Sequence, residues 1–220
     1  MSLTITEIRK DAEIKVLMER ADRNLEMLGY TEHGFRHSKV VAKTCGMILE
    51  KLERRKRIIE LGEIAGYLHD IGNLVNREQH AQTGAALAFR LLKDREMEIK
   101  EIAEICAAIG NHHEEDGSPV SDIAAALILA DKADVHRSRV RNLKQIKFDI
   151  HDRVNHAVTS SKLNIHNGRK VISLDITVDT EISPVMEYFE IFLSRMVISQ
   201  RAARYFGSEF ELIINGAKIL

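Results

Sequence analysis

Residues 58–72 read IIELGEIAGYLHDIG, an apolar segment with helical spacing that ends on a histidine and an aspartate. Ile64, Ala65 and Leu68 recur at the intervals of one helix face, and Gly72 stops the helix. His69 and Asp70 therefore lie side by side at the end of a buried helix. Neighbouring residues of a helix point about 100° apart, so the two side chains can bind different partners at one place in the fold.

The same periodicity predicts further helices over residues 5–28, 37–53, 80–92, 99–109 and 121–135, the last with Ser121 as its N-cap. After about residue 140, residues 162–165 and 171–178 alternate apolar and polar side chains, which indicates a hairpin. A helix over 186–206 and a strand over 210–214 follow. The predicted fold class is mainly α, with a helical body over residues 1–141 and a small C-terminal α/β segment over 142–220 that acts as a cap or a dimer interface.

The composition limits the class of protein. A length of 220 residues suffices for one helical domain and a small appendage, and the net charge of -1 gives no overall basic field for nucleic acid. Aromatic residues make up 5% and tryptophan is absent, which argues against a nucleic-acid-binding regulator. Cys45 and Cys106 form no metal-binding pattern. We find no leader-like or membrane-spanning segment, so we expect a cytoplasmic protein without a membrane partner.

Histidines gather at the predicted helix ends. Five of the ten fall there within the first 113 residues, namely His37, His69, His80, His112 and His113, and Asp131 stands inside an apolar helix. A single histidine at a helix end is more often a cap or a surface residue, and Asp131 alone is equally compatible with a hydrogen-bonded core carboxylate. Together they favour a divalent Mn, Fe, Co, Ni or Zn site, because these ions accept imidazole and carboxylate ligands. The chain has no Gly-x-Ser-x-Gly, Walker or GxGxxG motif.

The order His37, His69-Asp70, His112-His113, Asp131 resembles the signature of the HD superfamily of metal-dependent phosphohydrolases. LHDIG over 68–72 and ILADKAD over 128–134 are its most specific pieces. HAQTGA from His80 and NHHEEDG from Asn111 are similar to a two-metal subgroup that includes ribonuclease Y, the HD-GYP phosphodiesterases and diadenosine-tetraphosphate hydrolases. The short spacing from Asp70 to His80 is most similar to ribonuclease Y, and Gly117-Ser118-Pro119 replaces the Gly-Tyr-Pro of HD-GYP.

The resemblance implies a set of ligands and roles. His37, His69, Asp70 and Asp131 would hold one metal ion; Asp70, His80 and His112 would hold a second, with His113 in or beside that group. His69 and Asp70 would be the catalytic pair. Many relatives have lysine where this chain has Asn73, so we expect Asn73, Arg36, Arg137, Arg139 or Arg141 to bind the substrate phosphate.

The function that these residues imply is hydrolysis of a phosphoester of a nucleotide or short oligonucleotide by a metal-bound hydroxide, with two divalent ions as cofactors. The chain would then be an enzyme, either a phosphomonoesterase or a phosphodiesterase. The alternative is a non-catalytic HD module, stabilised by metal, that binds a nucleotide or a protein partner. A homodimer is a further expectation, because the apolar residues of 185–197 cover more than one helix face.

Overall fold

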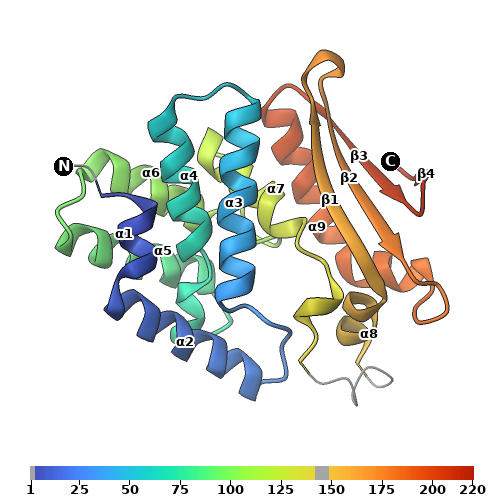
Figure 1. Cartoon of the computed structure of the whole chain (residues 1–220), viewed down its shortest axis with the longest axis horizontal. Coiled ribbons are helices and arrows are strands. Elements are labelled where there is room, and N and C mark those ends of the chain that lie inside the picture. Colours follow the sequence, from blue (N-terminus) through green and yellow to red (C-terminus); the bar gives the residue numbers. More distant parts are fainter. Residues whose placement is uncertain (1–2, 142–148) are drawn as a thin grey trace.

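The computed structural model describes residues 3–141 and 149–220 (Figure 1). Helices pack on one another in the first of these ranges: α1 (Ile5–Lys10), α2 (Ala12–Met27), α3 (Phe35–Lys51), α4 (Lys56–Leu68), α5 (His80–Asp94), α6 (Ile99–Gly110) and α7 (Asp122–Lys132). A 3₁₀ turn, η1 (Ile71–Leu74), links α4 to α5, and a second, η2 (Arg137–Arg139), follows α7. The predicted class, mainly α with a small C-terminal α/β segment, is confirmed.

Two predicted helices have different bounds in the structure. The helix expected over 5–28 is broken at Asp11, whose extended backbone ends α1 and whose side chain accepts a hydrogen bond from the Ile14 amide to start α2. The helix expected over 121–135 begins at the Ser121 cap as predicted but ends at Lys132. Arg137, Arg139 and Arg141 therefore do not continue along one helix beyond Asp131.

The C-terminal segment consists of a four-stranded sheet and two helices. These elements are α8 (Ile150–Ala157), β1 (Val158–His166), β2 (Val171–Val178), α9 (Val185–Tyr205), β3 (Glu209–Ile214) and β4 (Ala217–Lys218). β1 and β2 form the predicted hairpin, whereas β3 runs parallel to β2 because α9 carries the chain back across the sheet. The predicted domain boundary falls between residues 141 and 142, and residues 142–148 lie outside the described residues.

The segment packs directly on the helical body. α9 contacts α7 as well as β2 and β3, and Figure 1 shows it beside the strands at one end of the molecule. The buried Tyr188, Phe192 and Met196 of α9 belong to the same apolar core as the side chains of α3, α4 and α7. Ser161 of β1 also donates a hydrogen bond to the Ala133 carbonyl, 2.7 Å away, at the end of α7. Burial of α9 accounts for Tyr188, Phe192 and Met196, whereas Met186, Leu193 and Val197 of the same apolar pattern are exposed. Dimerisation stays a prediction.

Glycines allow the helices beside His69 and Asp70 to approach closely. At Gly66 a Cβ atom would lie 2.8 Å from the Ala42 Cα, so α4 crosses α3 at this point without a side chain between them. At Gly72 a Cβ would overlap the His80 carbonyl oxygen and crowd the Gly84 amide. Contact between η1 and the start of α5 brings His80 next to Asp70 and requires glycine at position 72.

We expect Gly72→Ala to destabilise the protein, because the neighbouring backbone of α5 cannot yield as a side chain would. Overpacking of this kind costs about 1–3 kcal/mol or more, which lowers the melting temperature of a chain of this size by roughly 5–10 °C. Gly168→Ala, at a position with open space around it, is the matched control and should leave the melting temperature within about 2 °C. Equal melting temperatures for the two variants in calorimetry would contradict the close contact.

Among the residues that the structure describes, no helix combines the length and the apolar character needed to cross a bilayer.

Candidate metal centre

Ends of five consecutive α-helices, and of the 3₁₀ turn η1 between two of them, meet at one buried point in the helical body. His37 lies in the first turn of α3, His69 follows α4, Asp70 precedes η1, and His80 opens α5. His112 follows α6, and Asp131 lies in the last turn of α7. The four histidines are at most 2% exposed. The structure thus brings together six of the seven residues that the sequence analysis selected as ligands.

The donor atoms of these residues have the separations that a shared cation requires. His37 Nε2 lies 3.2 Å from His69 Nε2 and 3.3 Å from Asp131 Oδ1, and His69 Nε2 lies 3.3 Å from Asp70 Oδ2. Two ligands that each lie about 2.1 Å from one ion are roughly 3 Å apart. The donors of Asp70, His80 and His112 form a second group, all within 4.8 Å of one another. His112 also groups with His69 and Asp131, so the two sets are adjacent.

Hydrogen bonds fix which ring nitrogen of each histidine faces the cluster. The Nδ1 atoms of His69, His80 and His112 lie 2.9, 2.9 and 2.6 Å from the carbonyl oxygens of Gly66, Arg77 and Ile109. A carbonyl oxygen only accepts, so in each case Nδ1 donates and Nε2 of the neutral ring keeps its lone pair. His37 Nδ1 likewise donates to a carboxylate of Asp134. Four Nε2 lone pairs therefore converge beside two carboxylates, an arrangement that a divalent cation satisfies.

Asp70 has a buried oxygen that is available to a cation. Its Oδ2 atom is buried and makes no hydrogen bond within the described residues. Its Oδ1 atom accepts from Asn73 Nδ2 at 3.0 Å and lies 3.6 Å from His80 Nε2. The two oxygens thus face the two groups of histidines, as a carboxylate bridging two ions would. Burial would raise the pKa of Asp70, but the neighbouring His69, whose Nε2 lies 3.3 Å from Oδ2, outweighs it and holds the pKa well below the usual value.

Asp131 is the second buried carboxylate. Its Oδ2 atom accepts a hydrogen bond from Lys132 Nζ at 2.7 Å, which leaves Oδ1 beside His37 and His69. Burial raises its pKa, but the positive charge of Lys132 outweighs burial, so the pKa lies well below the ordinary value. Both carboxylates of the cluster are therefore ionised at neutral pH and available as ligands.

Burial and the neighbouring carboxylates shift the pKa values of the clustered histidines in two directions. Burial lowers the pKa of His80 to about 4 and that of His112 well below the usual value, so both rings are neutral ligands at pH 7. Burial also acts to lower the pKa of His69, but the charges of Asp70 and Asp131 outweigh it and raise that pKa. A position between two carboxylates that attracts a proton also attracts a divalent cation.

Asp134 holds His37 in place, a role that sequence reasoning missed. Its Oδ2 atom accepts the His37 Nδ1 hydrogen at 2.6 Å and also the Arg36 Nη2 hydrogen at 2.8 Å. A carboxylate behind a metal-binding histidine fixes the ring orientation and raises its basicity. The sequence signal that could have identified Asp134 is its position, three residues after Asp131 in ILADKAD.

Two further histidines lie beside the cluster. The His113 ring centroid is 4.9 Å from that of His80, and its nitrogens lie 3.9 Å from Glu114 and 3.7 Å from Asp116. His113 does not belong to any of the close donor groups of the described residues, so a place among the ligands stays a prediction for it. The His33 ring lies 5.6 Å from that of His37, with Nδ1 donating to the Thr31 carbonyl.

The residues selected for phosphate binding lie in different places. The Asn73 amide donates to the backbone and carboxylate oxygens of Asp70, so it orients a candidate ligand. Arg36 forms ion pairs with Glu32 and Asp134, and Arg141 pairs with Asp22. Arg137 is exposed on η2. Substrate binding stays a prediction for these four side chains.

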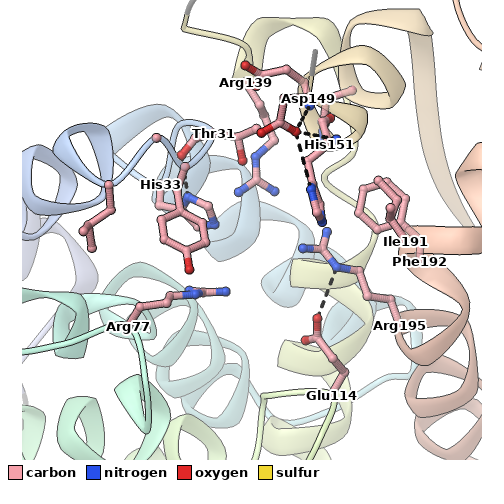
Figure 2. Close-up of a pocket in the computed structure, with 15 residues that line it drawn as sticks. Thr31, His33, Arg77, Glu114, Arg139, Asp149, His151, Ile191, Phe192 and Arg195 are labelled. Carbon is pink, nitrogen blue, oxygen red and sulfur yellow. Dashed lines mark hydrogen bonds and ion pairs between the residues drawn. The ribbon is translucent and has the colours of Figure 1, made fainter. Parts of the chain in front are cut away.

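A pocket beside the cluster contains the remaining candidate, Arg139 (Figure 2). Arg77 and Arg195 line the same pocket, and Figure 2 shows all three guanidinium groups around its centre. Sequence reasoning did not select Arg77 or Arg195, because a single arginine after η1 or within α9 has no motif around it. Their position relative to LHDIG and to α7 becomes visible only in the folded chain.

Residues 34–137 match the family described as HD domain, and this range contains all seven predicted ligands. Two curated relatives are similar over different lengths. Ribonuclease Y of Lawsonia intracellularis (strain PHE/MN1-00) is 38% identical over 105 residues, which are 46% of this chain and 18% of that protein. The uncharacterized protein MJ1020 of Methanocaldococcus jannaschii is 28% identical over 179 residues, 70% of this chain and 67% of that one. This chain thus spans less than a fifth of the ribonuclease and about two thirds of the second relative.

Among solved structures, a crystal structure described as a predicted HD superfamily hydrolase from an uncultured Thermotogales bacterium is similar, with a TM-score of 0.47 and 24% identity. The match covers 61% of this chain and 75% of that one.

Proposed function

The chain belongs to the HD-domain superfamily through residues 34–137, and on that premise we propose that it is a metal-dependent phosphohydrolase acting on a phosphoester of a nucleotide or short oligonucleotide. The observation that carries the proposal is the convergence of four Nε2 lone pairs and two ionised carboxylates on one buried point. Such a donor set fits Mn, Fe, Co, Ni or Zn better than calcium, which prefers oxygen ligands.

Each side chain of the cluster has a distinct task in this proposal. His37, His69, Asp70 and Asp131 would hold one ion, and Asp70, His80 and His112 would hold the second. When bound, such ions lower the pKa of a coordinated water and neutralise charge on phosphoryl oxygens. Asn73 keeps Asp70 Oδ1 oriented through its amide hydrogen, while Lys132 does the same for Asp131 Oδ2. Burial of the cluster excludes bulk water and strengthens these interactions.

The nearby guanidinium groups support an anionic substrate. Arg77 Nη1 lies 3.8 Å from Asp70 Oδ1 and also lines the pocket beside the cluster. A phosphoester bound there would place its negative oxygens against Arg77 on one side and against the ligand cluster on the other. Planar guanidinium groups bind two phosphate oxygens at once, so they can take the role that lysine has elsewhere.

The test is metal analysis of the purified protein followed by a phosphoester panel. We expect close to two transition-metal ions per chain, loss of activity on treatment with a chelator, and recovery when Mn²⁺ or Fe²⁺ is added back. The panel contains p-nitrophenyl phosphate, bis(p-nitrophenyl) phosphate, nucleoside monophosphates and 5′-phosphorylated di- and trinucleotides. A metal-loaded protein that hydrolyses none of them would favour the non-catalytic HD module instead.

A further inference from the structure

A pocket of about 270 Å³ adjoins the ligand cluster where the helical body meets the C-terminal segment (Figure 2). The body supplies the loop before α3, Arg77 after η1 and Arg139 in η2, whereas α8 supplies His151 and α9 supplies Phe192 and Arg195. Its volume lies near the lower end of small-molecule sites, roughly 300–1,000 Å³. It has room for a phosphate and part of a sugar.

Arg139 is the most buried cation of the pocket. It is 2% exposed, and burial lowers its pKa. Its Nε and Nη1 atoms donate to the backbone carbonyls of Glu32 and Asp134, at 3.1 and 2.8 Å. Within the described residues its Nη2 atom has no hydrogen-bond partner, and Figure 2 shows the guanidinium group directed into the pocket. Because this donor faces the pocket, an anion bound there can accept its hydrogen bond.

Arg77 and Arg195 flank the pocket with donors that are also available. Arg195 Nε lies 3.4 Å from Glu114 Oε1, and its guanidinium carbon lies 4.4 Å from the Phe192 ring centroid, so packing fixes the group's orientation. Arg77 is positioned in the same way, 5.6 Å from the Tyr30 ring centroid. Arg195 Nε donates to Glu114, and Arg77 Nη1 donates to Asn73 Oδ1 at 3.4 Å. Among the described residues, the Nη atoms of Arg195 and Nη2 of Arg77 are the donors left for a ligand.

The carboxylates that line the pocket are already engaged by the protein. Glu114 accepts a hydrogen bond from Lys132 at 2.5 Å, and Asp149 accepts from the backbone amides of His151 and Asp152 at the start of α8. Burial and the neighbouring Asp149 raise the pKa of Asp152. Glu114 pairs with Lys132 as well as Arg195, whereas Asp149 and Asp152 lie at the start of α8, so the three guanidinium groups are the cations that line the pocket.

We propose that this pocket binds a second phosphate group of the substrate, next to the phosphate that lies at the ligand cluster, and that Arg195 of the C-terminal segment is one of its binding residues. The inference rests on the proposed function and narrows it to substrates with at least two phosphates. Arg77 connects the two places, because it lies 3.8 Å from Asp70 Oδ1 and lines the pocket. The second phosphate can come from the next phosphodiester of an oligonucleotide or from a nucleoside diphosphate.

The experiment compares full-length, metal-loaded wild type with Arg195→Gln, Arg195→Lys and Arg201→Gln. Arg201 is an exposed arginine of the same helix and serves as the matched control. One arm measures kcat/KM for the dinucleotide TpT and for pTpT, which carries an additional 5′-phosphate. The other arm measures calorimetric binding of α,β-methylene-ADP, a diphosphate that is not hydrolysed. Metal content and melting temperature are recorded for every variant.

Removal of the Arg195 charge should lower kcat/KM for pTpT, affinity for α,β-methylene-ADP, or both, by about 10- to 100-fold, the range for a charge-assisted hydrogen bond to a phosphate. For TpT we expect a loss of about 3-fold or less, and Arg195→Lys should recover part of the larger loss. An effect on pTpT alone identifies an oligonucleotide phosphate, and an effect on α,β-methylene-ADP alone identifies a diphosphate. Metal content should equal that of the wild type.

The outcomes separate the two proposals. The subsite proposal is overturned if wild type, Arg195→Gln and Arg201→Gln hydrolyse pTpT with equal constants and bind α,β-methylene-ADP equally well. The phosphohydrolase proposal then stands. Absence of hydrolysis with Arg195-dependent binding of α,β-methylene-ADP overturns the enzyme and leaves the anion pocket. A wild type that neither prefers pTpT to TpT nor binds α,β-methylene-ADP overturns the subsite as well.

Discussion

Asp70→Asn should reduce both metal content and phosphoester hydrolysis to near background. The substitution keeps the shape of the side chain but removes the charge that faces both groups of histidines, through Oδ2 at 3.3 Å from His69 and Oδ1 at 3.6 Å from His80. A bridging carboxylate contributes to both ions, so its loss weakens both. Because metal ions supply several kcal/mol of transition-state stabilisation, we expect a rate at least about 1,000-fold lower.

The measurement is metal content by mass spectrometry together with kcat/KM for the best substrate of the panel. Asp94→Asn is the matched control, because Asp94 is an exposed residue of α5 that pairs with Arg90 at the surface. It should retain wild-type values for both quantities. Asp70→Asn protein that holds its metal and keeps its rate within threefold would exclude Asp70 as a ligand.

His80→Ala should remove one ion and leave the other. His80 belongs to the group with Asp70 and His112 but not to the group with His37 and His69. Removal of its Nε2 therefore weakens the second position selectively, and metal content should fall from about two ions per chain to about one. We expect the rate to fall about 100-fold, since one ion then has to neutralise the phosphoryl charge alone.

His166→Ala is the corresponding control, because His166 lies in the hairpin at the far end of β1. The site holds a single metal ion if titration shows one ion per chain in the wild type and His80→Ala keeps the same metal affinity and the same rate of hydrolysis. The fall in stoichiometry is the decisive quantity, since a rate change alone can arise from altered packing.

The sequence predicted the helices of the body well because their apolar faces repeat regularly and their ends carry clear signals. Ser121, for example, caps α7 as its residue type indicates. The resemblance carried by LHDIG and ILADKAD supplied the candidate ligands. Periodicity alone cannot supply them, since side chains from five α-helices meet only after folding. The predicted cytoplasmic location and the homodimer stay predictions.

The features that the sequence analysis did not predict each have an identifiable physical cause. α8 has eight residues and is rich in polar side chains, so its apolar pattern is too short to detect, and its start depends on Asp149 as an N-cap. The break at Asp11 is invisible to periodicity because the apolar face continues across it. Arg77 and Arg195 were missed for another reason: no local pattern distinguishes a guanidinium group that faces a pocket from one that faces solvent.

Because its side chains come from five consecutive α-helices, the cluster would also cross-link the fold once an ion binds. Residues 37 to 131 span most of the helical body, and an ion that binds their side chains holds these helices together only when all of them are in place. Because the unfolded chain has no such site, metal binding adds to the free energy of unfolding, by about 2.7 kcal/mol when free metal is 100 times its dissociation constant. Metal supply would then control how long the folded chain persists against proteolysis, as well as how fast it turns over substrate.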